Sequence, residues 1–239
     1  NGADQHGYNI LLLTRSRNQP ERSIFHGGTN SLRLADGAIL MGISPSHEEL
    51  KHLTEEGYPF VYIGRRDVPG IDFDWVISDY VSAGQQGAQH LLDLNHRRIG
   101  YVHEQGSHKA RSFQERWQGC QSAVAAAADA EILLIDQEQI AQPEQLLDLL
   151  KRERITALIC NDANNFREVM QALAQTALHV PRDLSLLALG DTLGDFPTSM
   201  NVTYVRLNQQ IVGERAIEQL VRRIEATEPL PVSHTLVPC

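Results

Sequence analysis

Short apolar runs alternate along this chain with longer segments whose apolar residues fall at the three-and-four spacing of one helix face. The runs have the length of buried strands, and their order predicts strand and helix in alternation. In the first half the predicted strands are Asn9–Thr14, Ala38–Met41, Phe60–Ile63, Val76–Ser78 and Ile99–Val102. In the second half they are Ile132–Ile135, Ala157–Ile159, Leu184–Leu189, Val202–Val205 and Ser233–Val237.

The segments between these runs carry helix signals. Ser46 and Glu49 form a capping box that begins a helix ended by Gly57. The segment from Glu21 to Leu34 contains two adjacent glycines and is expected to be a broken helix or irregular. The other predicted helices cover 82–95, 112–128, 163–177 and 209–226, with one more beginning at Pro143. This alternation predicts an α/β fold with two parallel sheets and right-handed crossovers.

The stretch 91–102 (LLDLNHRRIGYV) joins a predicted helix to a strand. Asn95 ends the helix, because Asn tolerates the left-handed conformation common at helix C-termini. A basic turn, HRR, follows and leads directly into the strand. Upstream, another short strand ends at Asp79, just before the helix, for which Ser82 is a candidate cap.

This order resembles the effector-binding module of the lac/gal repressor family of bacterial transcription regulators. The family has a strand, Asp-Asn, a helix with a glycine, His-Leu and then Gly-His-Arg-Arg-Ile. This chain has Asp79-Tyr80, Gly84, His90-Leu91 and Asn95-His96-Arg97-Arg98-Ile99, with Tyr80 in place of Asn and Asn95 in place of Gly. The similarity continues through Arg116-Trp117-Gln118-Gly119, Asn161-Asp162 and Val180-Pro181-Arg182-Asp183-Leu184-Ser185, and covers nearly the whole chain.

The resemblance implies a two-lobed, periplasmic-binding-protein-like fold, in which two parallel three-layer αβα sheets are joined by a three-crossing hinge and close on a small ligand. One lobe would hold 1–104 and 201–226, and the other 105–200 and 232–239. The crossings would lie near 104–108, 197–201 and 227–231. The family's first lobe begins with a further strand and helix, which the first lobe is expected to lack here.

Arg116 is the first candidate ligand residue. The resemblance implies a position at the mouth of the cleft, where the fixed fork of guanidinium donors can hold two adjacent oxygens of a sugar, nucleoside or carboxylate. Without the resemblance, an exposed helix arginine is the favoured interpretation. Asp79 follows a strand, so it can accept hydroxyl protons from a sugar or cap the next helix, and the two roles are compatible.

Asn161 and Asp162 also follow a strand, and helix capping explains them equally well. After the strand Leu184–Leu189, this chain has Gly190-Asp191 where the family typically has two aspartates, the first of which often contacts the effector. The loss of that acceptor predicts an effector bulkier or more anionic than simple hexoses and pentoses. Alternatively, an offset of one residue places Asp191 in the cleft.

Composition and motifs exclude several classes of protein. With 42% hydrophobic and 21% charged residues the chain is ordinary globular protein, and no apolar run has the length of a membrane span. Cys120, Cys160 and Cys239 lie far apart, which argues against a zinc site or a disulfide framework and favours a reducing compartment. There is no nucleophile elbow, glycine-rich phosphate loop or histidine pair at metal-binding spacing, so no catalytic residue, metal site or cofactor is predicted.

The net charge of −9 leaves this chain without the basic surface by which proteins bind phosphates. We therefore expect the effector-sensing domain of a cytoplasmic, homodimeric transcriptional repressor that binds a sugar or sugar derivative, with DNA bound by a helix-turn-helix domain outside this chain. The alternative is a periplasmic solute-binding protein of a sugar transporter, which shares the two-lobed fold. An enzyme is a third and weaker possibility. The His96–Ile99 and Arg116–Gly119 motifs and the unpaired cysteines favour the regulator.

Overall fold

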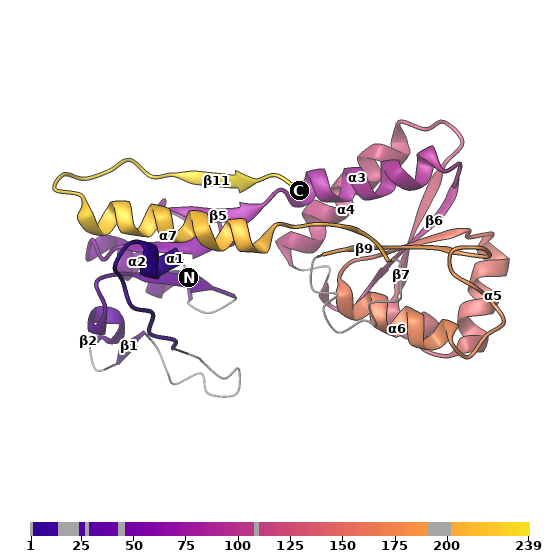
Figure 1. Cartoon of the computed structure of the whole chain (residues 1–239), viewed down its shortest axis with the longest axis horizontal. Coiled ribbons are helices and arrows are strands. Elements are labelled where there is room, and N and C mark those ends of the chain that lie inside the picture. The colour runs from indigo at the N-terminus through magenta and orange to yellow at the C-terminus, as the bar shows by residue number, and fades with distance from the viewer. Residues whose placement is uncertain (1, 14–23, 27–28, 43–45, 108–109, 191–201) are drawn as a thin grey trace. The chain divides into compact units, whose positions relative to one another are not determined.

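The computed structural model describes residues 2–13, 24–26, 29–42, 46–107, 110–190 and 202–239 (Figure 1). The chain forms two compact units: the first comprises Asn1–Ser78 and Gln209–Val237, and the second comprises Asp79–Asn208 and Pro238–Cys239. Each unit contains one larger, wholly parallel sheet, which confirms the predicted fold class. No helix within the described ranges combines the length and the apolar character needed to cross a bilayer.

The chain passes between the units three times, at Ser78, Asn208 and Val237. This division differs from the predicted one, which placed residues 79–104 in the first lobe and the last strand in the second. The strand that begins at Arg98 pairs with two strands of the second unit, so the first crossing lies before it. The last strand pairs with Trp75–Ser78 and therefore lies in the first unit.

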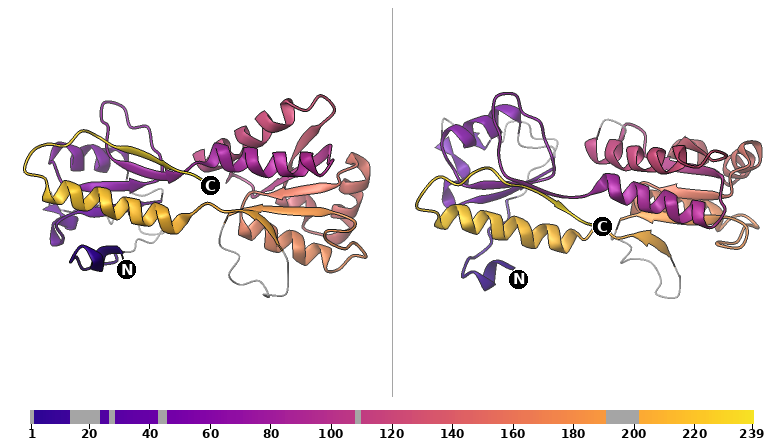
Figure 2. Two further views of the ribbon diagram at one scale, coloured as in Figure 1. Left: turned by 45° about the horizontal axis from the view of Figure 1, so that its top comes forward. Right: turned by 90° about the horizontal axis from the view of Figure 1, so that it is seen from above.

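The sheet of the second unit has the order β10-β9-β8-β6-β7. Its strands are β6 (Arg98–His103), β7 (Glu131–Asp136), β8 (Ala157–Cys160), β9 (Ser185–Leu189) and β10 (Thr203–Val205). Successive residues face opposite sides, so Val102 and Leu158 belong to one hydrophobic cluster and Tyr101 and Ile159 to the other. The first cluster is completed by α5 (Pro143–Glu153) and α6 (Ala163–Leu173), and the second by α3 (Tyr80–Asp93) and α4 (Arg111–Ala125). Figure 2 shows α3 and α4, magenta to pink, side by side on one face of this sheet.

The main sheet of the first unit has the order β11-β5-β4-β3. Its strands are β3 (Ala38–Met41), β4 (Phe60–Ile63), β5 (Trp75–Ser78) and β11 (His234–Val237). The helix α7 (Gln209–Glu225) packs Val212 and Ala216 against the buried Val61, Val76 and Val237. The helix α2 (His47–Glu55) begins at the predicted capping box of Ser46 and Glu49, and a short α1 (Gly2–Gln5) contacts α7.

One expectation for the beginning of the chain is wrong. Residues 9–13 of the predicted strand Asn9–Thr14 form no strand, and Ile10 to Leu13 are between 55% and 80% exposed. A strand needs a hydrogen-bonded neighbour, and among the described residues β3 pairs only with β4, so the first apolar run has none. For the segment 21–34, expected to be a broken helix or irregular, the described part contains the two-residue antiparallel strands β1 (Phe25–His26) and β2 (Thr29–Asn30) and the 3₁₀-helix Ser31–Leu34.

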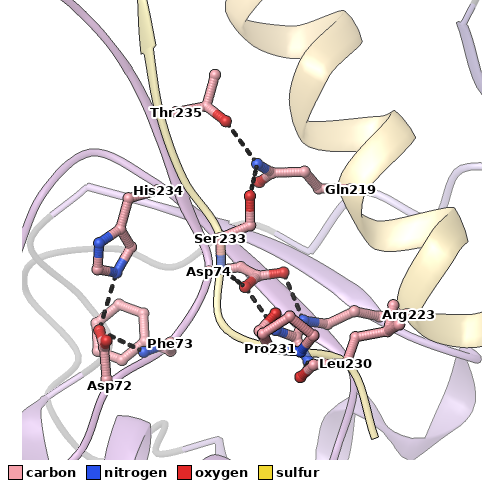
Figure 3. A network of polar contacts seen from close by, with 10 residues as sticks. All are labelled: Asp72, Phe73, Asp74, Gln219, Arg223, Leu230, Pro231, Ser233, His234 and Thr235. Atoms are coloured by element: carbon pink, nitrogen blue, oxygen red, sulfur yellow. Dashed lines mark hydrogen bonds and ion pairs between the residues drawn. The ribbon is translucent and has the colours of Figure 1, made fainter. Parts of the chain in front are cut away.

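A buried ion pair fastens the end of α7 to the first unit's sheet (Figure 3). Asp74, which is 3% exposed, accepts two hydrogen bonds from the Arg223 guanidinium and one from the Ser233 backbone N–H. Arg223 also donates to the carbonyls of Leu230 and Pro231. One side chain of α7 thereby holds the start of β5 and the segment leading into β11.

The basic turn of the most distinctive sequence motif has a structural role. The two ring nitrogens of His96 each lie 2.8 Å from a hydroxyl, those of Thr156 and Ser185, which stand at the starts of β8 and β9. Arg97 donates to the Leu92 carbonyl and Arg98 to the Glu153 carbonyl. Asn95 has a φ of +66°, as expected for the residue that ends the helix. The motif therefore connects the end of α3 to the starts of β6, β8 and β9.

This geometry predicts a pH-dependent stability. Burial, and secondarily the nearby His90, lower the pKa of His96 below its ordinary value of 6.5. A depressed histidine pKa means that the unfolded chain binds the proton more readily, so the stabilisation is complete above about pH 6.5 and is lost as the pH falls through the lowered pKa. Urea denaturation between pH 5 and 8 should show this loss, and His96→Gln should reduce it. An unchanged pH profile in His96→Gln would contradict this assignment.

Candidate functional site

Two of the candidate residues of the second unit lie where one of its strands ends. Asn161 and Asp162 directly follow β8, and Asp79 stands at the beginning of the unit, one residue before α3. In open parallel sheets, ligands bind at the carboxyl ends of the strands. The structure brings three of the predicted residues, Arg116, Asn161 and Asp162, into one hydrogen-bonded chain.

Arg116, on α4, is buried and not the exposed helix arginine of the alternative interpretation. The residue as a whole is only 8% exposed. Nη1 lies 3.4 Å from Oδ1 of Asn161, and Nε has no hydrogen-bond partner among the described residues. A buried guanidinium with an unused N–H is costly unless a further acceptor completes it. This donor is therefore the strongest chemical signal of a ligand site.

Asn161 is the hub of the cluster. Its Oδ1 also accepts a hydrogen bond of 2.9 Å from the hydroxyl of Tyr101, which is fully buried, and its Nδ2 donates to Asp162 at 3.3 Å. Burial raises the pKa of the Tyr101 phenol well above its ordinary value, so this hydroxyl remains a donor. The sequence did not point to Tyr101, because a tyrosine in an apolar strand resembles any other core residue.

Tyr80, the first residue of α3, covers the Arg116 guanidinium. The Arg116 Cζ lies 4.4 Å from the centre of the Tyr80 ring, the geometry of a cation–π contact. The only sequence signal for this role was the departure of Tyr80 from the asparagine usual at this position. The ring stacks on the face of the guanidinium, whereas the N–H donors of Arg116 lie in its plane.

Asp79 and Asp162 are both helix caps. Oδ1 of Asp79 accepts from the Ser82 N–H, so Asp79, rather than Ser82, caps α3. Oδ1 of Asp162 accepts from the N–H groups of Asn164 and Asn165 and caps α6. Within the described part of the chain, Oδ2 of Asp79 has no hydrogen-bond partner. Asp79 can therefore cap its helix and still accept a ligand hydroxyl.

Asp191, the fifth predicted residue, lies outside the described residues. Gly190 is described and has a φ of +151°, a conformation that residues with a side chain rarely adopt. A Cβ at this position would meet only the Leu207 side chain, at 3.9 Å. Backbone conformation, rather than a lack of space, thus explains the glycine at this position.

The charges around the cluster are mainly negative. Burial and the carboxylates of Glu104 and Asp162 raise the pKa of Glu168, on α6. Asp79 adds another carboxylate at the start of α3. The Arg116 guanidinium therefore lies among hydrogen-bond acceptors, an arrangement that suits a ligand rich in hydroxyl groups.

Comparisons with known proteins agree on one family. A family model described as a periplasmic binding protein-like domain matches residues 88–239. The HTH-type transcriptional repressor PurR of Actinobacillus pleuropneumoniae is 24% identical over 92% of this chain and 66% of its own length. The HTH-type transcriptional regulator CelR of Thermobifida fusca is 26% identical over 95% of this chain and 68% of its own length. The chain thus spans about two thirds of the length of these relatives.

Solved structures agree in fold. A regulatory protein of the LacI family from Chloroflexus aggregans superposes with a TM-score of 0.80 and 25% identity, covering 99% of this chain and 85% of that one. A complex of the regulator CelR with cellobiose has a TM-score of 0.77 and 24% identity over 99% of this chain and 73% of that one. A LacI family regulator from Enterococcus faecium with bound ribose has a TM-score of 0.71 and 19% identity, covering 86% of this chain and 77% of that one.

Proposed function

Since this chain belongs to the LacI family of transcriptional regulators, as its periplasmic-binding-protein-like effector domain, we propose that it binds a sugar or sugar derivative through Asp79, Arg116, Asn161 and Asp162. The relatives named above are regulators rather than enzymes, and two of the similar structures hold cellobiose and ribose. Asp191 is proposed as a further contact from its position in the sequence alone.

One observation carries this proposal: the nine-tenths buried guanidinium of Arg116 keeps an N–H without a partner among the described residues. A sugar oxygen supplies the missing acceptor. Oδ2 of Asp79, which has no partner among the described residues, accepts a sugar hydroxyl. A sugar ring carries both an acceptor and a donor on neighbouring carbons. The half-buried ring of Tyr80 adds an apolar surface for the C–H face of the sugar.

The electrostatics of the described residues favour a neutral, hydroxyl-rich effector. The sequence alone had favoured a more anionic one, because Gly190 removes an acceptor. However, an anion at Arg116 would also meet the carboxylates of Asp79 and Asp162, and like charges at close range repel. We therefore infer that neutral mono- or disaccharides bind more tightly than sugar acids or sugar phosphates.

For the whole protein we propose a cytoplasmic, homodimeric repressor whose DNA contacts lie in a separate helix-turn-helix domain. The net charge of −9 supports a DNA-binding surface outside this chain. An operator with two-fold symmetry has two half-sites, and a dimer places one helix-turn-helix domain on each. The alternative, a solute-binding protein of a sugar transporter, has no observation in its favour here beyond the shared fold.

A calorimetric screen tests the proposed effector class. We expect at least one of cellobiose, ribose, glucose and galactose to bind this chain more tightly than gluconate or glucose 6-phosphate. Arg116→Lys should weaken binding by about 1.5–3 kcal/mol, the range for a hydrogen bond to a charged group. Arg152→Lys, on the exposed face of α5, is the matched control and should bind like the parent. Tighter binding of the anionic sugars, or equal binding by Arg116→Lys, would contradict the proposal.

A further inference from the structure

The helices α3 and α4 touch through their backbones at two glycines. A Cβ built on Gly84 would lie 2.0 Å from the carbonyl oxygen of Arg116. A Cβ built on Gly119 would lie 2.0 Å from the carbonyl oxygen of Val81 and 2.8 Å from the Gln85 nitrogen. Because the neighbours are backbone atoms, no side chain can rotate away to make room. Each glycine therefore permits an approach that no other residue permits.

The backbone atoms touched by these glycines belong to the turns that carry the site. Gly84 meets the carbonyl of Arg116 itself, and Gly119 meets the carbonyl of Val81, the residue after Tyr80. At the same crossing the Cys120 thiol donates to the Gly84 carbonyl at 3.2 Å. The distance between α3 and α4 at this crossing therefore determines the position of the Arg116 guanidinium over the Tyr80 ring.

We propose that Gly84 and Gly119 are positioning residues for the ligand site, acting by placing the Arg116 guanidinium on the Tyr80 ring and within reach of Asn161. This inference rests on the proposed function, because it assigns the glycines a role through Arg116. An alanine at either glycine would require the helices to separate by about 1 Å, from 2.0 Å to the roughly 3.0 Å that real Cβ atoms show as a minimum. Such a shift would weaken the 4.4 Å stack and would be enough to lengthen the 3.4 Å contact with Asn161 beyond hydrogen-bond distance.

A third glycine on α3 provides the matched control. The three atoms nearest to a Cβ on Gly87 would all be side-chain atoms, of Leu189 at 3.0 Å, Leu187 at 3.1 Å and Val205 at 3.5 Å. Gly87 faces the sheet, whereas Gly84 faces α4. Gly87→Ala therefore adds the same methyl group to the same helix without separating α3 from α4.

The test measures the Arg116–Tyr80 stack directly and needs no ligand. In protein with isotopically labelled arginine, the Arg116 side-chain protons should be shifted upfield by the Tyr80 ring, and Tyr80→Leu identifies that shift by removing it. We expect Gly84→Ala and Gly119→Ala to reduce the upfield shift and Gly87→Ala to keep it, with helix content by circular dichroism unchanged. Cys120→Val, which crowds the same crossing less severely, provides a milder variant and should reduce the shift partially.

Affinity for the tightest sugar of the calorimetric screen is the second measurement. We expect a loss of about tenfold or more in Gly84→Ala and Gly119→Ala, since a displacement near 1 Å is enough to uncouple a positioned polar group. An unchanged Arg116 shift in Cys120→Val and in the glycine variants, or unchanged affinity despite a lost shift, would overturn the positioning role. Failure of every sugar to bind the parent protein would instead refute the proposed function, while the ring-current result would still test the geometry.

Discussion

Replacing Arg223 with methionine is expected to destabilise the first unit by about 3–5 kcal/mol, the cost of leaving a buried charge without its partner. Asp74 is 3% exposed, and Arg223 supplies two of its three hydrogen bonds. After the substitution, the Ser233 N–H is the one hydrogen-bond donor to this carboxylate that remains among the described residues. Arg223→Met also removes the donors to the Leu230 and Pro231 carbonyls, so the start of β11 loses its attachment to α7.

The two tryptophans allow this effect to be measured in one unit at a time. Trp75 lies in the first unit and Trp117 in the second. In a Trp117→Phe background, urea denaturation followed by tryptophan fluorescence therefore reports the first unit. Arg222→Met, on the exposed face of the same helix, is the control and should change the free energy of unfolding by less than about 0.5 kcal/mol. Equal effects of the two substitutions would contradict a role for the ion pair.

Much of this fold could be predicted because its signals are local. The capping box at Ser46, the glycine at 57 and the asparagine at 95 each act within a few residues, and each lies at the predicted helix end. The run 9–13 shows where local signals fail. It has the composition of a buried strand, but whether it becomes one depends on a neighbouring strand, which is a property of the sheet and not of the run.

The division into units was mispredicted for the same kind of reason. The strand Ile99–Val102 was correctly predicted, and β6 contains it, but no pattern within the strand states which sheet it joins. Its hydrogen bonds to β7 and β8 decide that it belongs to the second unit. Strand order depends on pairings between distant segments, which the apolar pattern of any one strand does not encode.

The candidate site was predicted in part, and only where family motifs supplied the residues. Arg116, Asn161 and Asp162 were named in advance, and the structure joins them. Tyr101 was missed because its role depends on an acceptor 60 residues away. The role of Tyr80 as the cover of Arg116 was missed because a helix-starting tyrosine has many uses, and only the α3–α4 crossing places it over the guanidinium.

Replacing Asn161 with leucine is expected to destabilise the second unit strongly, because it leaves two buried donors without their acceptor. The Tyr101 hydroxyl loses its partner at a cost of about 1–3 kcal/mol, and the charged Arg116 guanidinium loses more. Leucine has the same branched heavy-atom skeleton as asparagine and is the larger residue, so the substitution removes hydrogen bonds without creating a cavity. In a Trp75→Phe background, Trp117 fluorescence reports unfolding of the second unit alone.

Tyr101→Phe tests whether the cost arises in this way. Alone it should cost about 1 kcal/mol, the net value of one hydrogen bond, because Asn161 keeps Arg116 as a donor. Combined with Asn161→Leu it should recover part of the stability lost, since the buried hydroxyl that lacked an acceptor is then absent. The loss in free energy of unfolding of the double variant should therefore differ from the sum of the two single losses by about 1–2 kcal/mol, as it does for residues in direct contact. Costs that add to within about 0.3 kcal/mol would mean that Asn161 stabilises the unit independently of Tyr101.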